Sequence, residues 1–587
     1  MRKLILGIVA VLLVFNAFAG PENNSLRVGT TQEPDNLNPW EGSADTKENA
    51  MNLFFLGLTY FDNTGTLQAG LAETVPTVGN GGIVNDEASG TQTVTWTLRE
   101  GLTWSDGTPL TTADVEFTLE VQRNDLVPSN TKGFTDSITD FTVVDDRTFT
   151  ITYDNISLTS TQPGGNIGLA RFNDVAPKHV WEPIFNDAVA AASGDAEAFL
   201  AQFIGAAPAT AAQGPTVASG TFQMVEWQPG QFMRGEPNPN FAIAPAKLDF
   251  VQMEFFADQN TLIANILNGT LDASDDIGLA GQDPAVLQAQ FDGAVNVSPS
   301  GFIEHFNVNQ FEACQDAQDL LLGDKRTRQA IIQAVNREAL HPVVFPPSLL
   351  STSFVVNGDI GYLDGIENEW PYNPEAASAL LAELGWVDSD DNGVLDRVDE
   401  NGRFINFNLR HIATPANFRL QTQEILQQDF AQVGINLIAD NGPASVVFAA
   451  AHLNRAEECS WPHIFEFAEA AGLGISPFDP LAQQLDPNQL SNAESNFSGS
   501  NYSGTIVPGY AELIADAQAA AFDTEARAAI VEEMQRIFLD ELPLIPLYER
   551  GEIITVKSGL QNYEKGTPLA KTIFWNPWEW CWDGVSC

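Results

Sequence analysis

Polar and apolar residues alternate in several short runs of the first half of the chain, a pattern typical of β-strands. The clearest runs are 93–100 (TVTWTLRE), 147–154 (RTFTITYD) and 220–236 (GTFQMVEWQPGQFMRGE). The last run has Pro229-Gly230 at its centre, a dipeptide that favours a tight turn, so we expect a hairpin there. The Ala-rich segment 188–204 predicts a helix between the strands. The first half is therefore expected to be mainly β.

Beyond residue 325 the apolar residues recur three and four positions apart, which is typical of amphipathic helices. Such segments occupy 327–340, 373–386, 418–435 and 525–542. Asn373-Pro374 is a start signal and Gly385 a stop signal for the second of them. A strand-like run, 543–556, follows the last helix, so this half predicts helices packed on a sheet. The polar stretch 485–505 predicts a long surface loop.

The amino terminus has the pattern of a secretory signal peptide. Residues 1–3 (MRK) precede an apolar run at 4–15, and the small-x-small site Ala17-Phe18-Ala19 follows. A membrane anchor is the alternative, but this apolar run is shorter than the ~20 residues that span a bilayer. We expect cleavage after Ala19, and no cysteine follows that site to carry a lipid. The mature protein is therefore expected to be periplasmic or extracellular, without a lipid anchor.

Size and charge narrow the class of protein. A chain of 587 residues exceeds the ~100 to 200 residues of one domain, so we expect two or three domains. A hydrophobic content of 44% excludes a disordered chain. The 77 acidic residues outnumber the 27 basic ones, and the resulting charge of −50 repels nucleic acid and anionic lipid. Because the acids are scattered along the whole chain, we interpret them as a solvated coat.

The four cysteines are expected to form disulfides, because an exported chain meets an oxidising compartment. Spacing alone leaves three pairings open. We expect Cys581 to pair with Cys587 across a short loop, and Cys314 with Cys459 to join distant parts of the second half.

The segment 388–399 (DSDDNGVLDRVD) has the spacing of an EF-hand-type calcium loop. The ligand positions are filled by Asp388, Asp390, Asn392, Val394 (through its carbonyl), Asp396 and Asp399. Gly393 allows the sharp turn of such a loop. Asp399 stands in place of the usual bidentate Glu, and its shorter side chain extends less far toward the ion. We expect a calcium ion that braces this part of the chain and performs no chemistry. An acidic surface turn is the alternative.

One segment carries a family resemblance. Residues 98–119 (LREGLTWSDGTPLTTADVEFTL) combine a basic residue, Glu-Gly, an aromatic, Ser-Asp-Gly and Thr-Ala-Asp-Val. Asp106-Gly107 predicts a tight turn, and Thr111 to Asp114 predict the cap of a helix beginning near Val115. Further matches follow in order: 26–39, 176–182, 220–230, 238–241, 325–338, 372–386, 430–437 and 542–548. The chain resembles the extracellular solute-binding proteins of family 5, the oligopeptide, dipeptide and nickel binders of ATP-driven (ABC) importers.

The resemblance implies an α/β fold of the two-lobed periplasmic binding protein class, type II. The first lobe would span 20–300 and include an extra β-rich subdomain at about 75–200. The second lobe would span 301–545, and a return segment, 546–587, would complete the first lobe. A monomer would close its two lobes on a small solute and deliver it to a membrane permease.

The resemblance also directs attention to 458–480 (ECSWPHIFEFAEAAGLGISPFDP). Peptide-binding relatives place an Asp here that pairs with the α-amino group of the ligand, but this chain has no clear Trp-x-x-Asp. Glu466 and Glu469 are the nearest acids, and either could anchor a cation unless both lie on an exposed helix face. Trp461 and Trp575 could stack on sugar rings, which leaves oligosaccharides open beside peptides, although buried aromatics are often plain core.

Enzymatic function is the main alternative, in the form of a secreted hydrolase acting on a polysaccharide or peptide. Paired carboxylates are easy to find among so many acids and therefore carry little information. The chain contains no Gly-x-Ser-x-Gly, no His-Glu-x-x-His and no phosphate-binding glycine loop, and its six histidines are isolated. A passive surface protein would predict repeats, which are missing. We therefore expect a binding protein with no catalytic residues and no catalytic cofactor.

Overall fold

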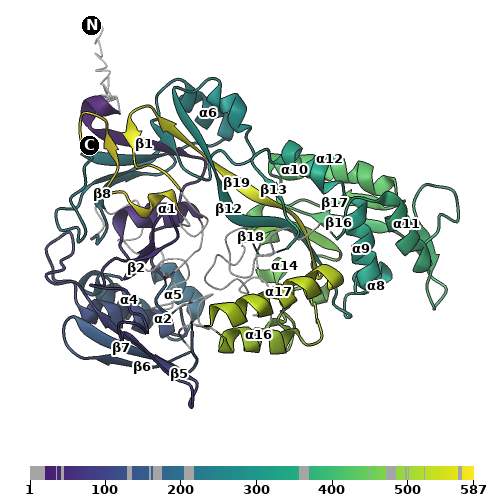
Figure 1. Ribbon diagram of the computed structural model, residues 1–587, viewed down its shortest axis with the longest axis horizontal. Coiled ribbons are helices and arrows are strands. Elements are labelled where there is room, and N and C mark those ends of the chain that lie inside the picture. Colours follow the sequence, from purple (N-terminus) through teal and green to yellow (C-terminus); the bar gives the residue numbers. More distant parts are fainter. Residues whose placement is uncertain are drawn as a thin grey trace, which may run out of the picture.

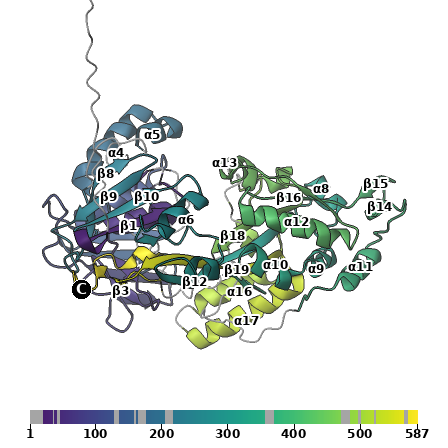
Figure 2. The same cartoon turned by 90° about the horizontal axis from the view of Figure 1, so that it is seen from above.

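The structure is a computed structural model that describes residues 20–587, apart from 35, 41–44, 128–134, 136, 158–159, 163–174, 204–216, 354, 356–368, 449, 471–483, 496–498, 500, 521–522 and 566–571. The predicted signal peptide lies outside the described residues. The described chain forms two lobes joined by long strands (Figures 1 and 2). No helix among the described residues is both long enough and apolar enough to cross a bilayer.

The first lobe is built on one half of a large mixed sheet. Its strands are β1 (Ser25–Thr30), β8 (Phe222–Gln228), β9 (Phe232–Pro237), β10 (Phe250–Phe255) and β11 (Ala273–Ser274). β1 pairs in parallel with β10 and β11 and is buried at five of its six positions, as expected of a strand inside a parallel part of a sheet. β8 and β9 form the predicted hairpin, and Gly230 has the positive φ of 70° that its turn requires.

The smaller elements of this lobe complete its core and carry the chain's end. They are η1 (Pro21–Asn23), α1 (Asp45–Phe54), β2 (Thr59–Phe61), β3 (Leu67–Ala69), α6 (Gln259–Leu267), α7 (Pro284–Gln288), β20 (Leu560–Gln561), η5 (Ile573–Trp575) and β21 (Cys581–Trp582). The carboxy terminus returns to this lobe and lies beside β1, as Figure 1 shows. The indole of Trp582 donates to the Ser25 carbonyl at 2.9 Å, which fastens the tail to β1.

A four-stranded antiparallel sheet forms the β-rich part of the first lobe, inside the predicted span of about 75–200. Its order is β4 (Ile83–Asp86), β5 (Thr91–Thr97), β7 (Thr148–Tyr153) and β6 (Ile138–Val143). The helix α2 (Thr112–Arg123) begins three residues before the predicted start at Val115. The predicted cap is present: the Thr111 hydroxyl accepts from the Ala113 amide, and the Asp114 carboxylate accepts from the Thr111 amide.

The predicted helix at 188–204 is wrong in its bounds, because two helices cover this region. They are α4 (Lys178–Ala192) and α5 (Ala196–Phe203). The break falls at Ser193 and Gly194, whose φ values of 50° and 91° are left-handed and end α4. This end of α4 was not predicted, because the surrounding segment is rich in alanine, which favours helix.

The second lobe holds the other half of the large sheet, with helices packed on it. Its strands are β13 (Leu349–Leu350), β14 (Asp396–Val398), β15 (Phe404–Asn406), β16 (Asn408–Ile412), β17 (Asn436–Ala439) and β18 (Ile464–Ala470). Its helices are α8 (Gln315–Asp319), α9 (Lys325–Ala334), α10 (Arg337–Val344), α11 (Pro374–Glu383), α12 (Asn417–Ala431), α13 (Ala444–Val447), α14 (Ala450–Leu453), η3 (Ala456–Glu458), η4 (Pro487–Gln489), α16 (Tyr510–Ala519) and α17 (Thr524–Glu541).

The four predicted helices of this half are present, with one difference. The segment 327–340 is split into α9 and α10, because Val335 is extended and the Asn336 side chain caps α10 by accepting from the Ala339 amide at 3.1 Å. The predicted surface loop at 485–505 is only partly at the surface, because Asn488, Gln489 and Glu494 are exposed whereas Ser491, Asn501, Ser503 and Thr505 are buried. The amide of Asn501 donates to the Thr505 carbonyl at 2.8 Å, so hydrogen bonds within the segment offset the burial of its polar groups.

Candidate functional site

Two strands, β12 (Gly293–Val308) and β19 (Leu544–Lys557), run from one lobe into the other (Figure 2). β12 pairs with β19 along most of its length and also pairs with β18 in the second lobe. The ladder between β12 and β19 is interrupted between Pro299 and Ile303, opposite Arg550. The expected lobe boundary at 300 falls in this interruption, whereas the return crossing lies near Arg550, a few residues after the expected position at 545.

The interruption has backbone features that suit a bend. Gly301 has a φ of 70°, in the left-handed region that favours glycine. A Cβ atom placed on Gly551 would lie 1.8 Å from the Pro347 carbonyl oxygen, so only glycine fits against the second lobe there. The crossing strands are therefore shaped by glycine at the level where the two lobes separate.

A buried group of charged side chains lies directly beside this interruption. Glu304, on β12, is fully buried. Its carboxylate accepts from Nε of Arg419, on α12, at 2.7 Å and from Nε of Arg550, on β19, at 2.9 Å. The two guanidinium groups lower the pKa of Glu304 to about 2, against the effect of burial, so this carboxylate is ionised at neutral pH. Three elements of the second lobe and the crossing are thus joined through one carboxylate.

Glu466, on β18, belongs to the same group. It is fully buried, and its Oε2 lies 3.0 Å from Nε2 of His411 on β16. Burial, followed by the charge of Glu304, raises the pKa of Glu466 well above its usual value. Burial lowers the pKa of His411 to about 3. Burial therefore favours the neutral forms of both Glu466 and His411, which disfavours Glu466 as a charged anchor for a ligand.

The structure does not bring the four predicted ligand-binding residues together. Trp461 is fully buried in the core of the second lobe, where its indole donates to the Leu453 carbonyl at 2.9 Å, which favours the core alternative over a stacking role. Glu469 is half-buried on β18, opposite Ile303, and not on an exposed helix face. Trp575 is half-buried in the returning tail, where its indole donates to the Glu564 carbonyl. The rest of the predicted segment, 471–480, lies outside the described residues.

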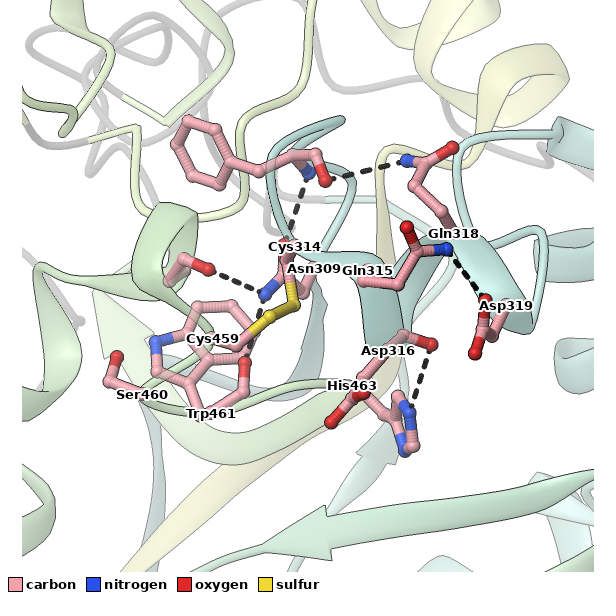
Figure 3. Close-up of a disulfide and its surroundings, with 12 residues drawn as sticks. Asn309, Cys314, Gln315, Asp316, Gln318, Asp319, Cys459, Ser460, Trp461 and His463 are labelled. Atoms are coloured by element: carbon pink, nitrogen blue, oxygen red, sulfur yellow. Dashed lines mark hydrogen bonds between the residues drawn. A yellow bond between two sulfur atoms is a disulfide. The ribbon is translucent and has the colours of Figure 1, made fainter.

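The chain leading into β18 is fastened to the end of β12 by a disulfide, shown in Figure 3. Cys314 and Cys459 are bonded, which is the expected pairing, across a separation of 145 residues. The Asn309 amide donates to the carbonyls of Ala456 and Trp461 at 2.9 Å each, beside the disulfide. These bonds hold the start of β18, which lies inside the predicted ligand segment 458–480, in place.

The second expected disulfide, Cys581–Cys587, is also present and closes a loop with a separation of 6 residues. It lies in the tail that returns to the first lobe. Both pairs therefore join the cysteines that the sequence analysis paired, and no cysteine is free.

The predicted calcium loop is only partly assembled. Ligand atoms of Asp388, Asp390 and Asp396 lie within 4.8 Å of one another. Asp399 is not one of this group, because it lies at the turn between β14 and β15, where its carboxylate accepts from Nε of Arg403 at 2.8 Å. The side-chain oxygen of Asn392 accepts from the Val394 amide at 2.7 Å. Calcium binding stays a prediction, with Asp399 removed from its ligands.

Glu304, Arg419 and Arg550 were not predicted as site residues from the sequence. The available signal was weak: Glu304 and Arg550 interrupt the largely apolar strands 302–308 and 544–556. A charge inside an apolar strand predicts a buried partner, but it does not say which residue that partner is. The partners come together only through the antiparallel pairing of β12 with β19 and the packing of α12.

Comparison with known proteins agrees with this architecture. The model of the bacterial extracellular solute-binding proteins, family 5 (middle region), matches residues 66–462. The oligopeptide-binding protein AppA of Bacillus subtilis is 22% identical over 435 residues, which cover 71% of this chain and 68% of AppA.

Two solved structures show the same fold over nearly the whole chain. The oligopeptide-binding protein of Thermus thermophilus, solved with a pentapeptide, is 30% identical with a TM-score of 0.81, covering 97% of this chain and 98% of that one. The structure of Bacillus subtilis AppA with a nonapeptide has a TM-score of 0.72 at 18% identity, covering 95% of this chain and 98% of that one. The resemblance that the sequence motifs carried is thereby confirmed, and the chain belongs to the bacterial extracellular solute-binding proteins of family 5.

Proposed function

We propose that this protein captures peptides outside the cytoplasm and delivers them to the membrane permease of an ABC importer. The observation that carries the proposal is the similarity, along nearly the entire chain, to a Thermus thermophilus protein solved with a pentapeptide. The family match favours binding over the hydrolase alternative. The signal-peptide pattern supports export, and a monomer with one solute per chain fits the two-lobed fold.

The proposed mechanism is closure of the two lobes around the peptide. The bend would occur where the ladder between β12 and β19 is interrupted, near Gly301 and Arg550. A solute that contacts both lobes stabilises the closed arrangement only by its extra contacts there. A shift from mostly open to mostly closed requires about 5 kcal/mol of differential affinity. The permease would then recognise the closed form.

The test is to purify the chain without residues 1–19 and to incubate it with separate mixtures of peptides and oligosaccharides. Retained molecules are identified by mass spectrometry after removal of the unbound material, and melting temperatures are recorded in parallel. We expect peptides of unchanged mass to be retained and the melting temperature to rise with them. Retention of oligosaccharides alone would contradict the peptide proposal, and recovery of shortened peptides would support the hydrolase alternative.

A further inference from the structure

The guanidinium group of Arg550 is held in one orientation by its neighbours. Its Nε and Nη2 both donate to Oε2 of Glu304. Its central carbon lies 5.0 Å from the ring centroid of Phe418 and 5.6 Å from that of Phe345. Glu304 therefore accepts from the Nε–Nη2 edge of the guanidinium, and Nη1 lies on a different edge. The side chain retains 22% of its exposure, whereas Glu304 and Arg419 are exposed by 0% and 8%.

This arginine lies at a contact between the two lobes. Gly281 follows β11 in the first lobe, and a Cβ atom placed on it would lie 3.8 Å from Cβ of Phe418 and 3.9 Å from Cδ2 of Phe345. These are the two rings that flank the guanidinium, and both belong to the second lobe. Arg550 is on the crossing strand itself, so a group bound to it would lie where the lobes meet.

The charges of Glu304, Arg419 and Arg550 do not cancel. Arg419 and Arg550 supply two positive charges, and Glu304 supplies one negative charge, because its pKa is about 2. Burial favours the neutral forms of Glu466 and His411, which lie 3.0 Å apart, so this pair is not counted as a charge. His305, on β12, is also neutral, since burial lowers its pKa to about 4. Among Glu304, Arg419 and Arg550, two positive charges and one negative charge leave +1, in a chain whose formal charge is −50. Glu549, the residue before Arg550, has a pKa of about 7 and is only partly ionised at neutral pH.

We propose that Arg550 binds a carboxylate of the captured solute at the lobe junction, and that this anion neutralises the excess positive charge of the group. For a peptide the carboxylate is its carboxy terminus or an acidic side chain. The planar guanidinium is suited to this role because it donates to a carboxylate in a fixed geometry and stays charged. The neighbouring rings exclude water and fix its orientation, which lowers the entropy lost on binding. This inference rests on the proposed function and adds the chemistry that the site selects.

The experiment compares titrations of pentapeptide mixtures, calorimetrically, against the wild-type protein, Arg550→Gln and Arg550→Lys. One mixture has free carboxy termini, a second has amidated termini and no acidic residues, and a third has amidated termini with Asp or Glu. Arg147→Gln is the matched control, because Arg147 lies in the β-rich part and pairs with the exposed Glu73. Melting curves and circular dichroism establish that each variant is folded.

We expect the wild type and Arg147→Gln to bind at least one carboxylate-bearing mixture about tenfold more tightly than the neutral mixture, as one charge-assisted hydrogen bond provides. In Arg550→Gln this preference should fall to less than twofold, and Arg550→Lys should restore part of it. The second and third mixtures distinguish the terminus from an acidic side chain. Equal binding of all three mixtures by the wild type would overturn the inference, and so would a preference that survives in Arg550→Gln.

Failure of the proposed function gives a different result. If the wild type binds no peptide, the peptide proposal fails, and small carboxylic acids are then compared with their amides on the same proteins. A preference for the acids that disappears in Arg550→Gln supports the anion site without the peptide. Absence of that preference overturns it.

Discussion

Removal of the Cys314–Cys459 disulfide should destabilise the second lobe far more than removal of Cys581–Cys587. A crosslink stabilises a fold mainly by lowering the entropy of the unfolded chain, and this effect grows with the logarithm of the loop length. For the separation of 145 residues the loop-closure expression gives about 5 kcal/mol at 25 °C. For the separation of 6 residues it gives about 2 kcal/mol. The difference follows from where the cysteines lie in the chain.

The assay compares two double variants, Cys314→Ala with Cys459→Ala and Cys581→Ala with Cys587→Ala, by urea unfolding. Hydrogen exchange of the β18 amides reports on the second lobe separately. The first variant should lose about 3 kcal/mol more than the second, with the loss located in β18 and the segment around Trp461. Equal losses in the two variants, or a loss confined to the first lobe in the first variant, would refute the loop-entropy reasoning.

Three further predictions concern buried charge and the acidic loop. Burial raises the pKa of Glu549 to about 7 from 4.5, so its contribution to stability is present below pH 4.5 and is lost as the pH rises through 7. In urea unfolding, the stability of Glu549→Gln relative to the wild type should therefore increase by about 3 kcal/mol between pH 4 and pH 9. A difference in stability that does not change with pH would contradict this pKa. The buried guanidinium of Arg328 donates to the carbonyls of Leu322, Gly323, Glu541 and Leu542. Arg328→Gln should therefore lower the free energy of unfolding by about 3 kcal/mol, measured by thermal unfolding. The control Arg326→Gln, on the exposed face, should lower it by less than about 0.5 kcal/mol. Calcium should raise the melting temperature of the wild type and not that of Asp388→Asn. A melting temperature of the wild type that calcium does not change would contradict calcium binding at this loop.

Much of the fold follows from local patterns in the sequence. The hairpin at Pro229-Gly230, the cap at Thr111 and the start of α11 at Asn373 were all predictable, because each depends on residues adjacent in the chain. Two helices were predicted with the wrong bounds, because each ends at a single C-cap residue inside an apolar or Ala-rich run: α4 at Ser193 and α9 at Val335. Tertiary contacts decide whether such a residue ends a helix, and they are not visible in the periodicity.

The candidate site was less predictable than the fold. Glu466 was singled out as a cation anchor, but its burial and the nearby charge of Glu304 raise its pKa, which disfavours the charged form. Trp461 was a stacking candidate by residue type alone, and packing against Phe465 makes it core. Arg550 was not noticed, since its importance comes from Glu304, which is 246 positions away along the chain. Long-range pairing determines which charges meet.

The most direct test of the account is small-angle X-ray scattering of the protein lacking residues 1–19, with and without a peptide that it retains. Two lobes that bend at the crossing strands β12 and β19 should give a smaller radius of gyration when the peptide is bound, with no change of mass. A radius of gyration that is the same with and without bound peptide would contradict capture by lobe closure.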